Sequence, residues 1–182
     1  MDRAVFLDRD GVLNVDRGYM CRRADFEWIG GVFAGLRRLR ELGYRLVVVT
    51  NQSGIARGYY TEADFAALTA WMEGELRAQG IALAAVYYCP HHPEHGIGAY
   101  RRHSDDRKPG PGMILRARDE LGVDLAQSAL VGDRDTDVEA ARRAGVGARI
   151  QVPTNGSGAF FADVEGALRR AFAVSPDILT LS

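Results

Sequence analysis

Short apolar runs alternate along the chain with longer segments in which apolar residues recur every three or four positions. The apolar runs are Ala4–Leu7, Leu46–Val49, Ala84–Tyr88, Ala129–Val131 and Ala148–Val152. Four of the five are nearly all apolar, as is typical of strands that are covered on both faces. Strands that alternate with helices predict a doubly wound, Rossmann-like α/β fold: a parallel sheet with helices on both faces.

The segments between these runs carry helix signals. Amphipathic helices are predicted over Gly31–Leu42, after Thr61, from Pro111 to Gly122 and over Asp135–Ala144. Thr61 is followed three residues later by Asp64, which is a cap-like opening. Pro111 and Gly122 stand in the usual order of proline first and glycine last. The residues beyond Val152 predict one final helix packed on the sheet.

Two long segments interrupt the alternation, Asn14–Ile29 and Pro90–Pro111. Loops of this length in a compact domain are usually functional. Neither is large enough to form a separate cap domain, so we expect one domain over residues 1–182 with an open site. Specificity should then come from these two loops.

Composition narrows the class of protein. The chain is 26% charged and 47% hydrophobic, with a formal net charge of −1, which gives no broad field for nucleic acid or an anionic membrane. Two cysteines make no disulfide framework, and no apolar stretch approaches the roughly 20 residues that span a bilayer. The first strand follows Met1 almost directly. We therefore expect a cytoplasmic protein without a signal peptide, and a monomer.

The first strand ends in Asp8-Arg9-Asp10-Gly11. Open α/β sheets bind ligands at the carboxyl edge of their strands, and residues two apart on an extended backbone point to the same side. Asp8 and Asp10 would repel one another unless a hard cation such as Mg²⁺ lay between them. A solvated turn is the simpler alternative, because Asp and Gly are common turn residues.

Three further strands end in polar residues. Thr50 begins Thr-Asn-Gln-Ser-Gly, whose hydroxyl and backbone N–H groups could hold an anion. Arg107 and Lys108 set two cations near the same edge, suited to phosphate. Asp133 would complete a Mg²⁺ site with the first two acids. Each could alone be a cap or a solvated charge, but four in order, each closing a strand, favour phosphate chemistry.

These motifs resemble those of the haloacid dehalogenase superfamily of phosphotransferases. Asp8-x-Asp10-Gly11 is similar to the first motif, Thr50 to the second, Lys108 to the third, and Gly132-Asp133 with Asp137 to the fourth. Within the superfamily, longer segments resemble the branch of the heptose bisphosphate and histidinol-phosphate phosphatases. Those segments are 6–11, 50–58, 88–93 and 107–109.

The resemblance implies a mechanism. Asp8 would attack phosphorus to form an aspartyl-phosphate, and Asp10 would protonate the leaving oxygen and later deprotonate the hydrolytic water. Spacing alone does not decide which of the two acids is the nucleophile. Mg²⁺ would be held by Asp8, Asp10 and Asp133, while Thr50 and Lys108 hold the phosphoryl oxygens.

The resemblance also implies substrate contacts and a substrate. The contacts would be Asp16, Arg17, Gly18, Tyr19, Asn51, Gln52, Ser53, Arg107 and Arg134. Arg107 and Arg134 would bind a second phosphate or the sugar hydroxyls. The implied substrate is D-glycero-D-manno-heptose 1,7-bisphosphate, which would lose its 7-phosphate on the route to nucleotide-activated heptose for lipopolysaccharide. Tyr19 could instead simply pack its loop.

The chain departs from this branch at its structural zinc site. Cys89-Pro90-His91 is present, but Ser104 and Asp106 stand where the branch has two cysteines. Cys89, His91, His103 and Asp106 could form an alternative zinc set. Because structural zinc sites depend on thiolate and imidazole ligands, we predict that the loop is held without zinc.

Three other functions stay open. Histidinol-phosphate phosphatases share the catalytic motifs, but their substrate carries an amine and an imidazole and would favour acids over Arg17, Arg107 and Arg134. A non-catalytic phosphate-binding domain would not need the complete set of motifs. A DNA 3′-end phosphatase shares the opening motif, and the near-zero net charge weighs against it.

Overall fold

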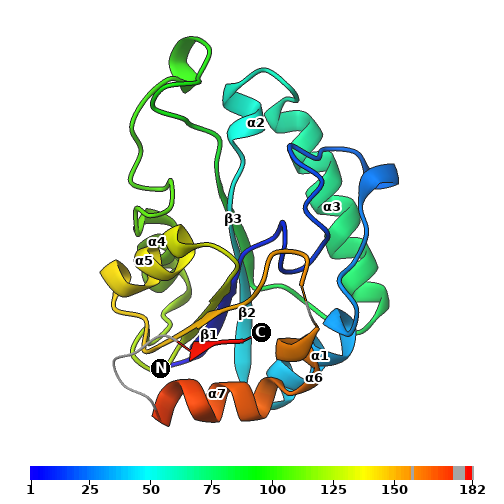
Figure 1. The fold of residues 1–182 in the computed structure, drawn as a ribbon, viewed down its shortest axis with the longest axis vertical. Helices are drawn as coiled ribbons and strands as arrows, with labels where there is room; N and C mark the ends of the chain where they lie inside the picture. The colour runs from blue at the N-terminus through cyan, green and yellow to red at the C-terminus, as the bar shows by residue number, and fades with distance from the viewer. Residues whose placement is uncertain (157, 174–178, 182) are drawn as a thin grey trace.

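The computed structural model describes residues 1–156, 158–173 and 179–181. Six parallel strands form one sheet in the order β3-β2-β1-β4-β5-β6 (Figure 1). The strands are β1 Arg3–Leu7, β2 Tyr44–Asn51, β3 Ala85–Cys89, β4 Ala129–Gly132, β5 Ala148–Gln151 and β6 Leu179–Thr180. The predicted doubly wound α/β class is confirmed, and the five predicted strands are present.

Helices cover both faces of the sheet (Figure 1). They are α1 Val32–Glu41, α2 Ser53–Ala56, α3 Glu62–Ala78, α4 Gly112–Leu121, α5 Asp135–Ala144, α6 Ala159–Ala162 and α7 Val164–Ala173. Side chains of α1, α3, α6 and α7 pack with those of β1, β2 and β5 in one apolar core. Side chains of α4 and α5 form a second core on the opposite face.

The helix ends follow the local sequence signals. Thr61 accepts a hydrogen bond from the backbone of Asp64 at 3.1 Å, and the Asp64 carboxylate accepts one from the backbone of Thr61 at 2.8 Å, so the capping box is complete. Gly122 ends α4 in the left-handed region at φ 65°, where glycine is favoured. The four predicted helices are therefore confirmed to within a few residues.

The end of the chain differs from the prediction. Instead of one helix, the tail forms α6 and α7 and then adds the edge strand β6 beside β5. Asp163 separates the two helices and accepts a hydrogen bond from the backbone of Gly166 at 3.0 Å. Phe160 and Phe161 are buried against the first core, as the apolar pattern predicts. Among the described residues, no helix has the length and hydropathy to cross a membrane.

The two long loops contain little regular structure. Arg23–Asp25 and Gly98–Tyr100 form single 3₁₀ turns, η1 and η2. The first loop is closed by the antiparallel bridge of Asn14 with Trp28. The second loop lies against the turn after α2, where the backbone of Ile97 donates to the carbonyl of Ala56 at 2.8 Å. Both loops rise above the carboxyl edge of the sheet (Figure 1).

Candidate active site

The three central strands bring the motif residues together at the carboxyl edge of the sheet. β1 pairs with β2 on one side and β4 on the other, so Asp8 and Asp133, which follow β1 and β4, lie beside Thr50 near the end of β2. The backbone N–H of Asp8 continues the ladder by donating to Val131 at 3.1 Å. All three side chains are almost fully buried. The register of the parallel sheet therefore converts three distant motifs into one site.

Lys108 enters this site from the second loop. Its side chain is 2% exposed, and its ammonium lies 2.9 Å from Asp8 Oδ1 and 2.6 Å from Asp137 Oδ1. It also donates to the carbonyl of Val49 at 2.7 Å. Burial alone would lower the pKa of Lys108, but the negative charges of Asp137 and Asp8 outweigh it and the net shift is upward. The side chain is therefore held as a cation.

Asp137 fixes the position of this lysine. Its second oxygen, Oδ2, accepts hydrogen bonds from the backbone N–H groups of Asp133 and Arg134, both at 3.1 Å. A Cβ at Gly132 would lie 2.3 Å from the Cβ of Asp137. A side chain at position 132 would thus displace Asp137, which explains the glycine before Asp133 in physical terms.

The acids of the site carry an excess of negative charge. Asp8, Asp133 and Asp137 place carboxylate oxygens within 4.8 Å of one another and face a single ammonium. Burial is the main cause that raises the pKa of Asp8, and it also raises that of Asp133. Asp133 Oδ1 is buried without a hydrogen-bond partner. A hard divalent cation would bind that oxygen and balance the charge, so these residues fit Mg²⁺.

Asp10 lies apart from this acidic group. Arg9 binds its carboxylate through Nε and Nη2 at 3.0–3.1 Å. Asn14 Nδ2 donates to Oδ1 at 3.0 Å and Gln52 Nε2 donates to Oδ2 at 3.1 Å. Among the described residues Asp10 is not part of the cluster of metal-binding side chains. Its carboxylate is oriented by three neighbours and faces the same cavity as Asp8.

Gln52 links Asp10 to the second motif. Its Nε2 also donates to Thr50 Oγ1 at 2.8 Å, and its Oε1 accepts from the hydroxyl of Tyr60. Burial is the main cause that raises the pKa of Tyr60, so this hydroxyl remains a donor. Asn51 is committed to the backbone of Lys108, with hydrogen bonds of 3.0 and 3.1 Å. The two amides therefore hold the motif residues Asp10, Thr50 and Lys108 in position.

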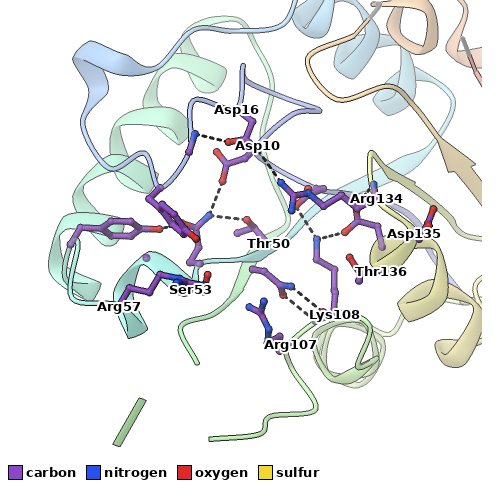
Figure 2. Close-up of a pocket in the computed structure, with 18 residues that line it drawn as sticks. Asp10, Asp16, Thr50, Ser53, Arg57, Arg107, Lys108, Arg134, Asp135 and Thr136 are labelled. Carbon is purple, nitrogen blue, oxygen red and sulfur yellow. Dashed lines mark hydrogen bonds and ion pairs between the residues drawn. The ribbon is translucent and has the colours of Figure 1, made fainter. Parts of the chain in front are cut away.

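A cavity of about 550 Å³ is lined by these groups and by residues of both loops (Figure 2). Most of the predicted substrate contacts line it: Asp16, Gly18, Tyr19, Asn51, Gln52, Ser53, Arg107 and Arg134. Arg17 does not line it, because its guanidinium pairs with Glu27 on the surface of the first loop. Arg134 pairs with Asp16 at 3.2 Å across the mouth of the cavity.

The alternative zinc set does not come together. Within the described residues, the acidic group around Asp8 is the one cluster of three or more potential metal ligands. The buried thiol of Cys89 is hydrogen-bonded to Ser104, and its pKa is raised chiefly by burial. Asp106 lies 3.7 Å from Arg116 in an ion pair, and His103 is exposed. The absence of zinc from the loop around Cys89 stays a prediction.

The sequence reasoning missed several residues of the site. Arg9 was not assigned a role, although an arginine between two motif acids is a signal of charge pairing. Arg57 and Tyr60 line the cavity, and only their place a few residues after Thr50 could have indicated this. Thr154 donates to Asp133 Oδ2 at 2.6 Å. It follows β5, whose polar end could have been read like those of the other strands.

The sequence is similar to that of a known family of phosphatases. Residues 106–180 match the HAD-hydrolase-like family model. A D-glycero-beta-D-manno-heptose-1,7-bisphosphate 7-phosphatase from Vibrio cholerae is 54% identical over 151 residues, which cover 83% of this chain and 81% of the relative. The corresponding alpha-heptose enzyme from Burkholderia mallei is 48% identical over 83% of this chain and 80% of the relative.

A solved structure supports the same relationship. The D,D-heptose 1,7-bisphosphate phosphatase from B. bronchiseptica, in complex with magnesium and phosphate, superposes with a TM-score of 0.76. Its sequence is 30% identical, and the match covers 99% of this chain and 92% of that one. The relatives therefore agree in both sequence and fold.

Proposed function

The chain belongs to the D-glycero-D-manno-heptose-1,7-bisphosphate 7-phosphatase family of the haloacid dehalogenase superfamily, and we propose that it hydrolyses the 7-phosphate of this sugar through an aspartyl-phosphate. One observation carries the mechanistic part of the proposal. The buried ammonium of Lys108 lies between Asp8, which directly follows β1, and Asp137 in the first turn of α5. This arrangement holds a charged nucleophile and a phosphate-binding cation in one place.

Asp8 is the nucleophile in this mechanism. One of its oxygens attacks phosphorus while the bond from phosphorus to the 7-oxygen of the sugar breaks. Lys108 and the Thr50 hydroxyl donate to the oxygens of the transferring group, where negative charge must be held. Both lie in the cavity with Asp8, and Lys108 already contacts its carboxylate.

Asp10 is the acid and base. It gives a proton to the departing sugar oxygen, then takes one from the water that attacks the aspartyl-phosphate, which releases inorganic phosphate and frees Asp8. Arg9, Asn14 and Gln52 orient its carboxylate. A group with this role must be held at a defined distance from the nucleophile, and these three neighbours supply that restraint.

Asp8 and Asp133 are the carboxylate ligands that we propose for Mg²⁺, with the free Oδ1 of Asp133 as one binding atom. When bound, the cation supplies positive charge against the phosphoryl oxygens. The carboxylate of Asp10, which was predicted as a third ligand, is engaged with Arg9. Asp10 therefore stays a proposed third ligand through its backbone carbonyl, in addition to its role in proton transfer.

The rim of the cavity supports a sugar bisphosphate over histidinol phosphate. Arg57, Arg107 and Arg134 line it together with two outer acids, Asp16, which is paired with Arg134, and Asp135, which accepts a hydrogen bond from Gln151. An amine or imidazole would meet repulsion there, whereas a second phosphate would meet complementary charge. We further propose that the enzyme acts in the cytoplasm and that its heptose 1-phosphate product is used for nucleotide-activated heptose in lipopolysaccharide synthesis.

Phosphate release from purified protein tests this function. The α- and β-anomers of the heptose bisphosphate and histidinol phosphate would be assayed side by side, with Mg²⁺ and with a chelator. We expect release from a heptose bisphosphate, its loss on chelation and its return with added Mg²⁺. Faster hydrolysis of histidinol phosphate, or full activity in the chelator, would contradict the proposal.

A further inference from the structure

The hydroxyl of Tyr60 is joined to the catalytic groups through the side chain of Gln52. Tyr60 is buried, and its hydroxyl donates to Gln52 Oε1. Gln52 Nε2 in turn donates to Asp10 Oδ2 at 3.1 Å and to Thr50 Oγ1 at 2.8 Å, and Figure 2 shows both of these hydrogen bonds. A chain of hydrogen bonds therefore leads from Tyr60 to the proposed acid and base.

The orientation of the Gln52 amide matters because its two ends have opposite character. Its NH₂ group only donates hydrogen bonds, and its oxygen only accepts them. In the reverse orientation the oxygen would face the carboxylate of Asp10, so that two acceptors would meet, and the NH₂ group would face the guanidinium of Arg9, which has donors alone. The amide therefore supports Asp10 in one orientation and repels it in the other.

Tyr60 supplies the stronger of the two restraints on this orientation. Arg9 Nη2 lies 3.5 Å from Gln52 Oε1, and the same nitrogen is already engaged with both oxygens of Asp10 at 3.0 Å. The contact from the Tyr60 hydroxyl to Gln52 Oε1 is shorter. Since burial is the main cause that raises the pKa of Tyr60, the hydroxyl keeps the proton that it donates.

The ring of Tyr60 is held by close packing. A Cβ at Gly54 would lie 2.2 Å from Cε1 of the ring, so the ring rests directly against the backbone of α2. Ile55 and Phe65 form a small buried apolar cluster with it. Because close-packed side chains have little freedom to move, the hydroxyl has a defined position beside Gln52.

We propose that Tyr60 is a positioning residue, which holds the Gln52 amide so that its nitrogen supports the carboxylate of Asp10. The inference rests on the proposed function, because Asp10 is the acid and base of that reaction. A carboxylate that gives its proton to a departing oxygen must keep its place through the step. Without the hydroxyl, the buried Oε1 would lose its shorter hydrogen bond and the amide could turn, so Asp10 would lose one of its three neighbouring donors.

Steady-state kinetics of Tyr60→Phe test the assignment, since the variant keeps the ring and removes the hydroxyl. We expect kcat/KM for the heptose bisphosphate to fall about 5- to 20-fold, chiefly through kcat. The loss in kcat/KM for p-nitrophenyl phosphate should be at least about threefold smaller, because nitrophenolate departs without a proton from Asp10. Equal losses on the two substrates would overturn the inference.

The matched control is Tyr59→Phe. Tyr59 is the adjacent tyrosine and is 60% exposed, so the substitution removes the same group from a ring outside the buried cluster. It should behave as wild type on both substrates. Thermal unfolding of each variant would show that it is folded. A loss in Tyr59→Phe equal to that in Tyr60→Phe would overturn the assignment to Tyr60.

A double-mutant cycle tests whether Tyr60 acts through Gln52. Gln52→Met removes both ends of the amide and keeps a side chain of similar length. In that background, Tyr60→Phe should change kcat/KM for the bisphosphate by less than about twofold. A loss as large as in the wild-type background would overturn the inference and indicate direct contact of the hydroxyl with the substrate.

The wild-type enzyme separates this inference from the proposed function. If the wild type hydrolyses the bisphosphate and Tyr60→Phe does so equally fast, the positioning role alone is overturned. Failure of the wild type to hydrolyse the bisphosphate would overturn the proposed function and the role of Tyr60 with it.

Discussion

The floor of the cavity, formed by Asp8, Thr50, Lys108, Asp133 and Asp137, differs from its rim, formed by Arg57, Arg107 and Arg134, in how far the polar groups are paired. On the floor, the side chains of Lys108 and Asp137 are 2% exposed and form an ion pair with one another. Asp137 also accepts hydrogen bonds from the backbone N–H groups of Asp133 and Arg134. On the rim, Arg57 and Arg107 come from a turn and a loop and leave buried nitrogens without partners. On the floor, the buried oxygen left without a partner is Asp133 Oδ1, at the proposed metal site, whereas the buried groups left without partners on the rim are arginine donors.

This difference indicates that the floor serves the chemical step and the rim serves substrate recognition. Groups that must meet a transition state are held by strand ends and a network of hydrogen bonds, because small displacements there cost large factors in rate. Groups that recognise a particular substrate keep free donors, since their hydrogen bonds must be made to the ligand. Chemistry and specificity therefore depend on different elements of the same fold.

The largest expected effect comes from the floor. Asp8→Asn should reduce turnover of the heptose bisphosphate by at least about a thousandfold, because the amide cannot act as the nucleophile. The fold should persist, since the variant removes a buried negative charge. Turnover and the thermal midpoint would be measured together. A near-normal rate would contradict the role of Asp8.

Replacement of the buried lysine should damage both stability and rate. Lys108→Met leaves Asp8 and Asp137 buried without their cation, and we expect a loss of about 3–5 kcal/mol in the free energy of unfolding. Urea unfolding in the absence of Mg²⁺ would measure it. The double variant Lys108→Met with Asp137→Asn should recover part of that loss, as removal of both partners leaves less unpaired charge. A simple sum of the two single losses would argue against a coupled pair.

We expect an effect of intermediate size from replacing Gly132, the last residue of β4. Gly132→Ala introduces a Cβ at 2.3 Å from that of Asp137, so the aspartate must move and Lys108 with it. We expect kcat to fall about tenfold or more while the KM changes little, because the displaced group acts on the transferring phosphate. A variant with unchanged kcat would show that Asp137 can shift without consequence.

On the rim, replacement of Arg134, which is paired with Asp16, should raise the KM less than replacement of Arg57, whose Nε has no partner. Arg134→Ala breaks an exposed ion pair with Asp16, which is worth less than about 1 kcal/mol of stability. We expect the KM for the bisphosphate to rise by less than in Arg57→Ala. Steady-state kinetics of the two variants under the same conditions would compare their KM values. A larger KM for Arg134→Ala than for Arg57→Ala would contradict the distinction between paired and unpaired arginines on the rim.

The smallest effect concerns the second loop. Protein purified without added zinc should contain well under one zinc per chain, because Cys89 contacts Ser104 and Asp106 is paired with Arg116. Cys89→Ser should accordingly leave the metal content unchanged. Elemental analysis by mass spectrometry would measure it. One zinc per chain in the wild type, lost in the variant, would show that the prediction is wrong.

The sequence predicted the floor better than the rim. Asp8, Thr50 and Asp133 directly follow apolar runs, so their meeting at one sheet edge follows from the parallel topology. The proximity of Arg57 and Arg107 depends on how two irregular segments fold against one another, and no periodic pattern reports that. Similarly, β6 spans only Leu179–Thr180, which is too short for a strand signal. Local patterns thus predicted regular elements but missed contacts between loops.

The central place of β1 has a consequence for how the chain is made. β1 leaves the ribosome before the other strands of this sheet, yet one of its edges pairs with β4, which begins only at Ala129. Until that strand emerges, an apolar strand edge in the nascent protein has no permanent partner and can pair with other chains. Slow synthesis between the second and fourth strands would therefore lengthen the period in which the protein depends on chaperones.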